Sequence, residues 1–153
     1  MFERIVLAID GADEAAGAIA AAVDLARKSG GKVLVVHVDG RGGAVRAGSA
    51  LDDDGARFVA TVVDTVRGWG VPVYSELRAA ASGAVAREIL LAAGSFDADA
   101  IVLGSRRLGA FAGLLLGSVA YKVIQLADCP VMVVKPVAAA AEGAGTLPAA
   151  VTA

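Results

Sequence analysis

Length, composition and charge exclude several classes of protein. The chain has 153 residues, which is room for one ordinary domain, and 57% of them are hydrophobic, so it can bury a full core. Its formal net charge is −2 and it has no long basic run, which gives no support to nucleic-acid binding. The single cysteine, Cys129, excludes an intrachain disulfide and a cysteine zinc site.

The apolar runs of the chain are short. The first of them covers residues 5–9, and a secretory signal peptide needs a longer apolar region. No stretch approaches the roughly 20 apolar residues that span a bilayer. We therefore expect no membrane partner and a cytoplasmic location.

Five short segments are predicted to be β-strands: residues 5–9, 33–38, 71–77, 100–103 and 131–134. Four of them are almost continuously apolar, which is typical of parallel strands covered on both faces. The segment 71–77 instead alternates apolar and polar residues and contains Pro72, which favours a place at the edge of the sheet.

Segments with helical periodicity separate the predicted strands. Apolar residues form a helical stripe between each pair of consecutive strands, and in the first of these segments Ile19, Ala22, Val23 and Ala26 follow the i, i+3, i+4, i+7 spacing. Trp69 ends the second of these stripes and is expected to pack against the core. Strands that alternate with helices predict an α/β fold with a parallel sheet and right-handed crossovers.

Two segments fall outside this alternation. Residues 40–50 contain several glycines and are expected to form a loop that arches over the top of the sheet. Residues 137–153 are rich in Ala and Gly and have no amphipathic period. We therefore expect one domain over residues 1–136, followed by a disordered tail over residues 137–153.

Candidate binding residues gather where the predicted strands end. Asp10 follows the first strand, Val38 closes the second, and Gly104 follows the fourth and opens a glycine-rich loop that leads to Gly117 and Ser118. Glycines let a backbone approach phosphate oxygens closely, and the first N–H groups of a helix attract anions. Each residue also has a plain structural interpretation, because Asp10 can cap a helix or turn and Gly117 can simply start a helix.

Several stretches of the chain resemble the universal stress protein family. They are the opening IVLAIDG at 5–11, DAIVLGSR at 99–106, LLLGSV at 114–119 and ADCPVMVVK at 127–135. The resemblance covers residues 2–136 and marks a UspA-like domain. It implies an open five-stranded parallel sheet of order 3-2-1-4-5 with two helices on each face, the arrangement also found in adenine nucleotide alpha hydrolase-like proteins.

The resemblance also implies roles for single residues. ATP-binding members share the pattern Gly-x2-Gly-x9-Gly-(Ser/Thr), in which x is any residue. Gly104, Gly117 and Ser118 match its first glycine, its last glycine and its hydroxyl residue. Asp10 matches the acidic residue that contacts the nucleoside, and Val38 matches the position whose backbone holds adenine.

The chain departs from the family pattern at Arg107, which stands where the second glycine is expected. A residue with a Cβ does not easily adopt positive φ, which favours a damaged loop. A guanidinium beside a phosphate is favourable, which supports a remodelled loop in which Arg106 and Arg107 contact the ligand. Both interpretations stay open at this point, as does a role for the two arginines as solvated loop charges.

Three functions compete on these grounds. The first is a stress-response protein that binds ATP or another adenine nucleotide, with Mg²⁺ as an accompanying ion, and acts as a dimeric signalling and binding module. The second is a family member that binds no nucleotide and acts through protein contacts. The third, an enzyme such as a nucleotidyl transferase, needs a histidine motif at a helix start. The single His37 lies inside an apolar strand, where we expect a near-core residue with a hydrogen-bond partner. We expect no enzymatic activity beyond slow ATP hydrolysis, for which no general base is assigned.

The last predicted strand, 131–134, suggests how two chains associate. It is apolar on both faces, and no further strand follows it. An exposed apolar edge invites pairing, so native proteins cover or pair such edges. We expect a homodimer through this strand, as the family resemblance also implies; a tail that folds back over the edge of a monomer is the alternative.

Overall fold

Strands and helices alternate along the chain as the sequence pattern predicts. The structure is a computed structural model, and it describes residues 1–40, 53–104 and 116–135. Its strands are β1 (Arg4–Ile9), β2 (Lys32–Asp39), β3 (Val73–Ala79), β4 (Ala100–Gly104) and β5 (Val131–Val134). Its helices are α1 (Ala12–Ser29), α2 (Asp53–Gly68), α3 (Val85–Ser95) and α4 (Ser118–Leu126). Most of the expected arch, both loop arginines and the expected tail lie outside the described residues.

The strands form one parallel sheet in the order β3-β2-β1-β4-β5, which confirms the predicted fold class. β1 is the central strand, and it pairs with β2 on one side and with β4 on the other. The chain therefore adds strands in one direction up to β3 and then crosses over to the opposite side of β1. Such a reversal opens a crevice at the carboxyl ends of the two strands that flank it.

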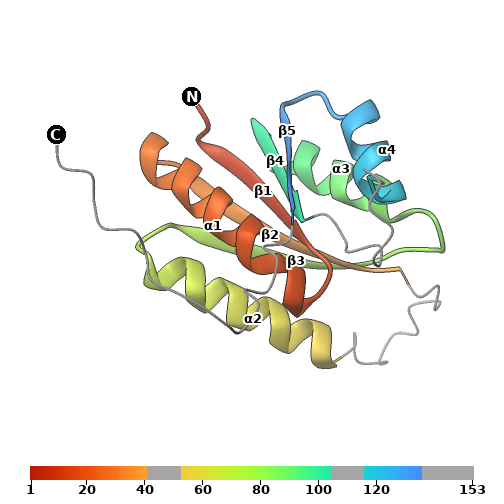
Figure 1. Cartoon of the computed structure of the whole chain (residues 1–153), viewed down its shortest axis with the longest axis horizontal. Helices are drawn as coiled ribbons and strands as arrows, with labels where there is room; N and C mark the ends of the chain where they lie inside the picture. The colour runs from red at the N-terminus through yellow and green to blue at the C-terminus, as the bar shows by residue number, and fades with distance from the viewer. Residues whose placement is uncertain (41–52, 105–115, 136–153) are drawn as a thin grey trace, which may run out of the picture.

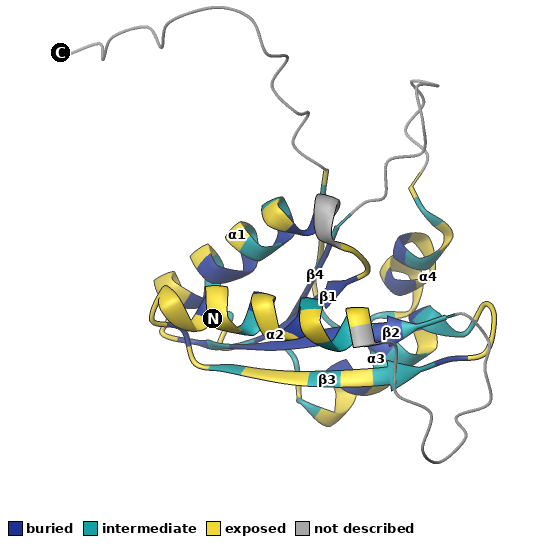
Figure 2. Ribbon diagram, turned by 90° about the horizontal axis from the view of Figure 1, so that it is seen from below, coloured by how far each residue is buried: buried dark blue, intermediate teal, exposed yellow. Residues whose placement is uncertain are grey.

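The side chains of the sheet alternate between two apolar layers. On one face, Ile5 and Leu7 of β1 pack with α1 and α2, and on the other face Val6 packs with α3 and α4. The two helices on each face agree with the prediction, and Figure 1 shows the sheet between them. Figure 2 shows the buried segments concentrated on the strands and on the helix sides that face them. Because both faces are covered, the central strands can be almost wholly apolar.

The third strand lies at the edge of the sheet as predicted, but its predicted bounds are wrong. It runs over Val73–Ala79 and not over 71–77, so Pro72 precedes the strand. Pro72 has no N–H to donate, and its carbonyl oxygen accepts a hydrogen bond from the N–H of Val33 at 2.9 Å. The strand continues past the predicted end because its pairing with β2 continues through Arg78 and Ala79, which lie opposite Val38 and Asp39.

Trp69 also differs from its expected role. The helix α2 ends at Gly68, one residue before it, and the tryptophan is 49% exposed. The apolar stripe of α2 is completed instead by Val59, Val62 and Val66, which are almost fully buried. Gly70 has a positive φ of 77° and turns the chain toward β3, and Trp69 stands on that turn.

The turn from α1 to β2 supplies a test of how tightly the N-terminal segment packs. A Cβ added at Gly31 would lie 2.7 Å from the Phe2 carbonyl oxygen and 2.8 Å from the Glu3 Cα and carbonyl oxygen. These are backbone atoms that cannot move aside alone. Gly31→Ala should therefore lower the free energy of unfolding by about 2 kcal/mol in urea denaturation.

Gly94→Ala is the matched control for this substitution. Gly94 lies within α3, and an added Cβ there meets no atom within 4 Å. Since alanine favours a helix over glycine, this variant should gain up to ~1 kcal/mol. Equal effects of the two substitutions would contradict the close packing at Gly31.

Candidate functional site

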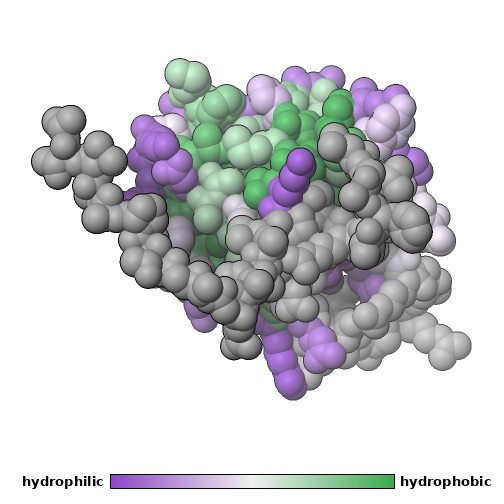
Figure 3. Space-filling model, in the orientation of Figure 1, coloured by the Kyte–Doolittle hydropathy of each residue, from purple (hydrophilic) through white to green (hydrophobic). Residues whose placement is uncertain are grey.

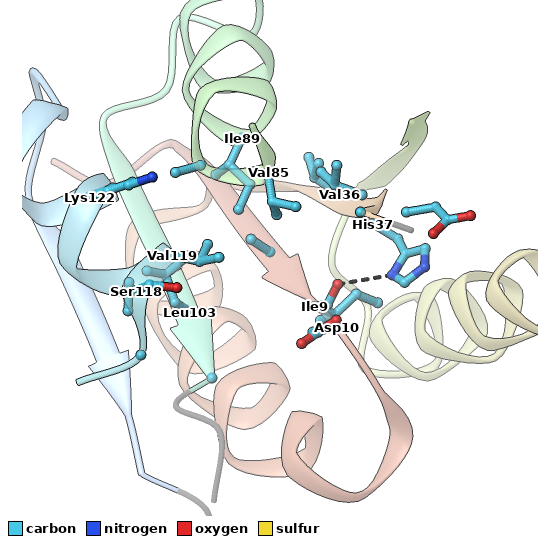
Figure 4. Close-up of a pocket in the computed structure, with 18 of the residues that line it drawn as sticks. Ile9, Asp10, Val36, His37, Val85, Ile89, Leu103, Ser118, Val119 and Lys122 are labelled. Atoms are coloured by element: carbon cyan, nitrogen blue, oxygen red, sulfur yellow. Dashed lines mark hydrogen bonds between the residues drawn. The ribbon is translucent and has the colours of Figure 1, made fainter. Parts of the chain in front are cut away.

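A cavity of about 570 Å³ opens at the carboxyl ends of β1, β2 and β4. Its floor is formed by the ends of these strands, and the starts of α3 and α4 form two of its walls (Figure 4). The cavity thus lies at the reversal of strand order, where an open α/β sheet places its ligands. Its apolar lining includes Ala8, Val36, Val85, Ala86, Ile89 and Leu103.

The structure brings together every predicted site residue that lies in its described part. Asp10, Val38, Gly104, Gly117 and Ser118 all line the cavity, although they come from four separate places in the chain. Arg106 and Arg107 belong to the segment 105–115, outside the described residues. The five described residues were predicted from strand ends and a helix start. Pairing of β1 with β2 and with β4 sets Asp10, Val38 and Gly104 at one edge of the sheet.

The second strand and the third helix meet closely at one side of the cavity. Gly40 follows β2, and a Cβ at this glycine would lie only 2.7 Å from the Cγ2 atom of Val85. The end of β2 is also tied to the next strand by a 2.8 Å hydrogen bond from the Ala80 N–H to the Asp39 carbonyl oxygen. These contacts hold Val38 and Val85 on the same wall and give the cavity an apolar slot.

The start of α4 supplies a polar wall. Gly117 is its N-cap residue, and the Gly117 carbonyl accepts the Tyr121 N–H at 2.9 Å. The N–H groups of Ser118, Val119 and Ala120 come before this bond and have no acceptor within the helix. The first turn carries no acidic side chain, so the partial positive charge of this helix end is not offset there. This wall suits an anionic group.

Charged side chains stand on different sides of the cavity. Asp10 follows β1 and Asp39 is the last residue of β2, whereas Lys122 comes from α4 and points toward α3 (Figure 4). Its ammonium lies 3.4 Å from the carbonyl oxygen of Gly83, in the turn before α3. The sequence interpretation missed Lys122 and the apolar wall from α3. Lys122 could have been found, because it follows Ser118 by four residues and therefore shares a helix face with it.

His37 is a half-buried histidine with a hydrogen-bond partner, as predicted. Its Nδ1 atom lies 3.0 Å from the carbonyl oxygen of Ile9, across the β1–β2 pair. The side chain thereby ties together the ends of the two strands that carry Asp10 and Val38. The ring also stands against α2, where a Cβ at Gly55 would lie 2.9 Å from Nε2.

Other side-chain chemistry in the described ranges is sparse. Burial raises the pKa of the Cys129 thiol above its ordinary value, and the nearby carboxylates of Asp99 and Asp128 add to this effect. A raised thiol pKa disfavours the reactive thiolate. No group of three or more His, Cys, Asp or Glu residues within residues 1–40, 53–104 and 116–135 could hold a metal ion. None of the four helices there has the length and apolar character to cross a membrane.

Fold and cavity together define an open α/β domain with a ligand-sized site at its topological switch point. The sequence profile of the universal stress protein family matches residues 1–135, and the chain belongs to this family. The match covers all the described strands and helices.

Curated relatives and solved structures agree with this assignment. A universal stress protein from Thermus aquaticus, encoded 3′ of a QAH/OAS sulfhydrylase, is 38% identical over 88% of this chain and all of its own. The universal stress protein YxiE of Bacillus subtilis is 32% identical over 88% of this chain and all of its own. A universal stress protein from Archaeoglobus fulgidus, solved in complex with dAMP, is 28% identical with a TM-score of 0.68 and covers 86% of this chain and 97% of its own.

The contact between His37 and Ile9 predicts which ring nitrogen carries the proton. A carbonyl oxygen can only accept, so Nδ1 must donate, and the neutral ring is therefore protonated at Nδ1 and not at Nε2. Nitrogen NMR at about pH 9, where an imidazole is neutral, should show this tautomer. The chain has one histidine, so its signals need no assignment.

The control for this measurement is the same spectrum of the chain unfolded in urea. The Ile9 contact is absent there, and the preference for Nδ1–H should disappear. A folded protein with its proton on Nε2 would show that His37 does not link the two strand ends.

Proposed function

We propose that the cavity binds ATP or another adenine nucleotide and that the protein acts as a stress-response binding module. One observation carries the proposal. Five residues predicted independently as a nucleotide site, from β1, β2, β4 and the start of α4, line a single cavity. The carboxyl ends of parallel strands meet at one edge of the sheet whatever their role, and here the start of α4, which attracts anions, completes a cavity around them. The dAMP complex of the Archaeoglobus relative supports the same class of ligand.

The cavity lining suggests how such a ligand is held. Adenine enters the apolar slot between Val38 and Val85, with the Val38 backbone as its hydrogen-bonding partner. The Asp10 carboxylate accepts hydrogen bonds from the ribose hydroxyls, which are donors. The phosphates meet the N–H groups at the start of α4 and the Ser118 hydroxyl, with Gly117 allowing close approach. Gly104 lies on the same phosphate side, and we propose that Arg106 and Arg107, outside the described residues, contact the phosphates, with Mg²⁺ accompanying ATP as its counter-ion.

Binding without turnover fits the described lining better than catalysis. The His37 imidazole stands at the end of β2 and Ser118 at the start of α4, on different sides of the cavity (Figure 4). A hydroxyl nucleophile needs a base within hydrogen-bond reach. We therefore propose that the protein signals through its nucleotide-bound state and that its function requires no chemical step.

Gly117→Ala gives a sharp test of the nucleotide site. Gly117 has a φ of −57°, which alanine adopts readily, and an added Cβ meets no protein atom within 4 Å. The free energy of unfolding should therefore fall by no more than about 1 kcal/mol, the cost of alanine in place of glycine at an N-cap. If phosphates approach this backbone, the methyl group obstructs them, and calorimetry should show affinity for ATP with Mg²⁺ reduced about tenfold, or ~1.4 kcal/mol.

Gly68→Ala is the control, since its added Cβ also meets no atom within 4 Å and the residue ends α2 away from the cavity. It should leave ATP affinity unchanged. A wild-type protein that releases no heat at millimolar ATP would count against the proposal. That outcome would favour a family member that acts through protein contacts alone.

We also propose a cytoplasmic homodimer built on β5. This strand lies at the edge of the sheet and pairs with β4 on its inner side. Met132 within it is 43% exposed, and Tyr121 and Ile124 of the neighbouring α4 are 53% and 44% exposed. Figure 3 shows hydrophobic residues gathered where Figure 1 draws β4 and β5. Two copies that pair this edge about a two-fold axis would cover it in a closed assembly.

Met132→Lys should weaken this dimer, because it places a charge on each copy at the paired edge. Light scattering should give wild type at twice the 15.2 kDa monomer mass and shift the variant toward the monomer. Leu91→Lys is the control: Leu91 is 46% exposed on α3, and its replacement should leave the mass unchanged. A wild-type monomer at micromolar concentration would exclude the dimer and favour a tail that covers the edge.

A further inference from the structure

The cavity separates its charges, and Lys122 carries the positive one. Two carboxylates, Asp10 and Asp39, lie at the ends of β1 and β2, and Lys122 stands on α4 at another side. The described residues that line the cavity include one lysine, Lys122, and no arginine, and the other basic side chain among them is the imidazole of His37. An anionic group of a ligand is repelled near the carboxylates and attracted near α4.

The contact of Lys122 with Gly83 does not use all the hydrogen-bond donors of the lysine ammonium group. The Nζ atom lies 3.4 Å from the Gly83 carbonyl oxygen, which is long for a hydrogen bond. An ammonium has three N–H donors, and this contact engages one of them. The side chain is exposed, and Figure 4 shows it pointing from α4 toward α3 at one side of the cavity. It can therefore turn toward a bound anion at little cost.

The position of Lys122 on the helix places it near the anion-binding wall. Ser118 and Lys122 are four residues apart on one face of α4, so their backbones are separated by about 6 Å along the helix axis. A lysine side chain spans a similar length and can reach back to a group held at the helix start. A phosphate chain bound at Ser118 would therefore meet both the N–H groups and the ammonium.

We propose that Lys122 is the residue by which this cavity selects phosphorylated nucleosides over unphosphorylated ones. The inference rests on the proposed nucleotide site and adds the basis of its selectivity. Lys122 binds the phosphate chain from the α4 side, while the carboxylates at β1 and β2 hold the ribose end away from it. The ligand is thereby oriented with its ribose toward Asp10 and its phosphates toward Lys122. A structural role for Lys122, as a brace between α4 and the turn at Gly83, predicts no such dependence on phosphate.

The test compares adenosine, AMP and ATP on wild type and on Lys122→Gln by calorimetry. Glutamine keeps a long polar side chain and removes the charge. AMP and ATP should bind the variant about tenfold more weakly, the size expected for a lost charge-assisted hydrogen bond, and adenosine affinity should change less than about twofold. Lys122→Arg should restore most of the ATP affinity, because it returns the charge. Higher salt should reduce the difference in ATP affinity between wild type and Lys122→Gln, because salt screens the charge of the lysine.

Lys28→Gln is the matched control, because it makes the same change in net charge on the exposed surface of α1, where Lys28 pairs with Asp24. It should leave all three affinities as in wild type. Equal weakening of adenosine and ATP by Lys122→Gln would assign the lysine to the brace and overturn the inference, as would unchanged ATP binding. A wild-type protein that binds none of the three ligands would overturn the proposed nucleotide site itself, and this result is distinct from either of the others.

Discussion

The structure depends on the burial of β1 between β2 and β4. Ile5, Val6 and Leu7 have no exposed surface, and their side chains alternate between the two apolar layers of the domain. Burial of each such side chain contributes roughly 1.5–3 kcal/mol, so this short strand supports both layers at once. The four described helices can cover the sheet only because its centre offers an apolar surface on each face.

The same constraint creates the cavity. Since β1 pairs with β2 on one side and β4 on the other, the helices that follow β1 and β4 in the chain, α1 and α4, cover opposite faces of the sheet. The gap between these two helices is the topological switch point. Residues at its rim are not covered on both sides as the strand residues are, so they need not be apolar. Exposed polar groups such as Asp10 and Ser118 can therefore stand beside a fully apolar core.

The two edge strands of the sheet differ in charge, and this difference favours one of them for dimerisation. At β3, Arg78 bridges Glu76 of its own strand and Glu88 of α3. The hydrogen bond to Glu76, with the pair to Glu88, raises the pKa of this guanidinium above its ordinary value despite partial burial. Lys32 also stands over the rings of Tyr74 and Phe96, at 5.8 and 5.5 Å from their centroids. Charges at an edge oppose pairing with another chain, whereas β5 presents Met132 and no charge within the strand. This asymmetry is why the proposed dimer uses β5.

Sequence alone determined the alternation of strands and helices, the edge position of β3 and five of the residues that line the cavity. Apolar periodicity reports which segments are covered on both faces, and strand ends and glycines mark where a ligand can approach; both are local signals. The bounds of β3 and the exposure of Trp69 depended on tertiary structure, since pairing with β2 extends the strand through Arg78 and Ala79 and α2 ends one residue before the tryptophan. Tertiary structure also decided that Val85, Ile89 and Lys122 join the site, because packing of α3 against α4 sets them opposite strand ends far away in the chain. A local pattern names the residues that can bind, but only long-range packing decides which of them share a cavity.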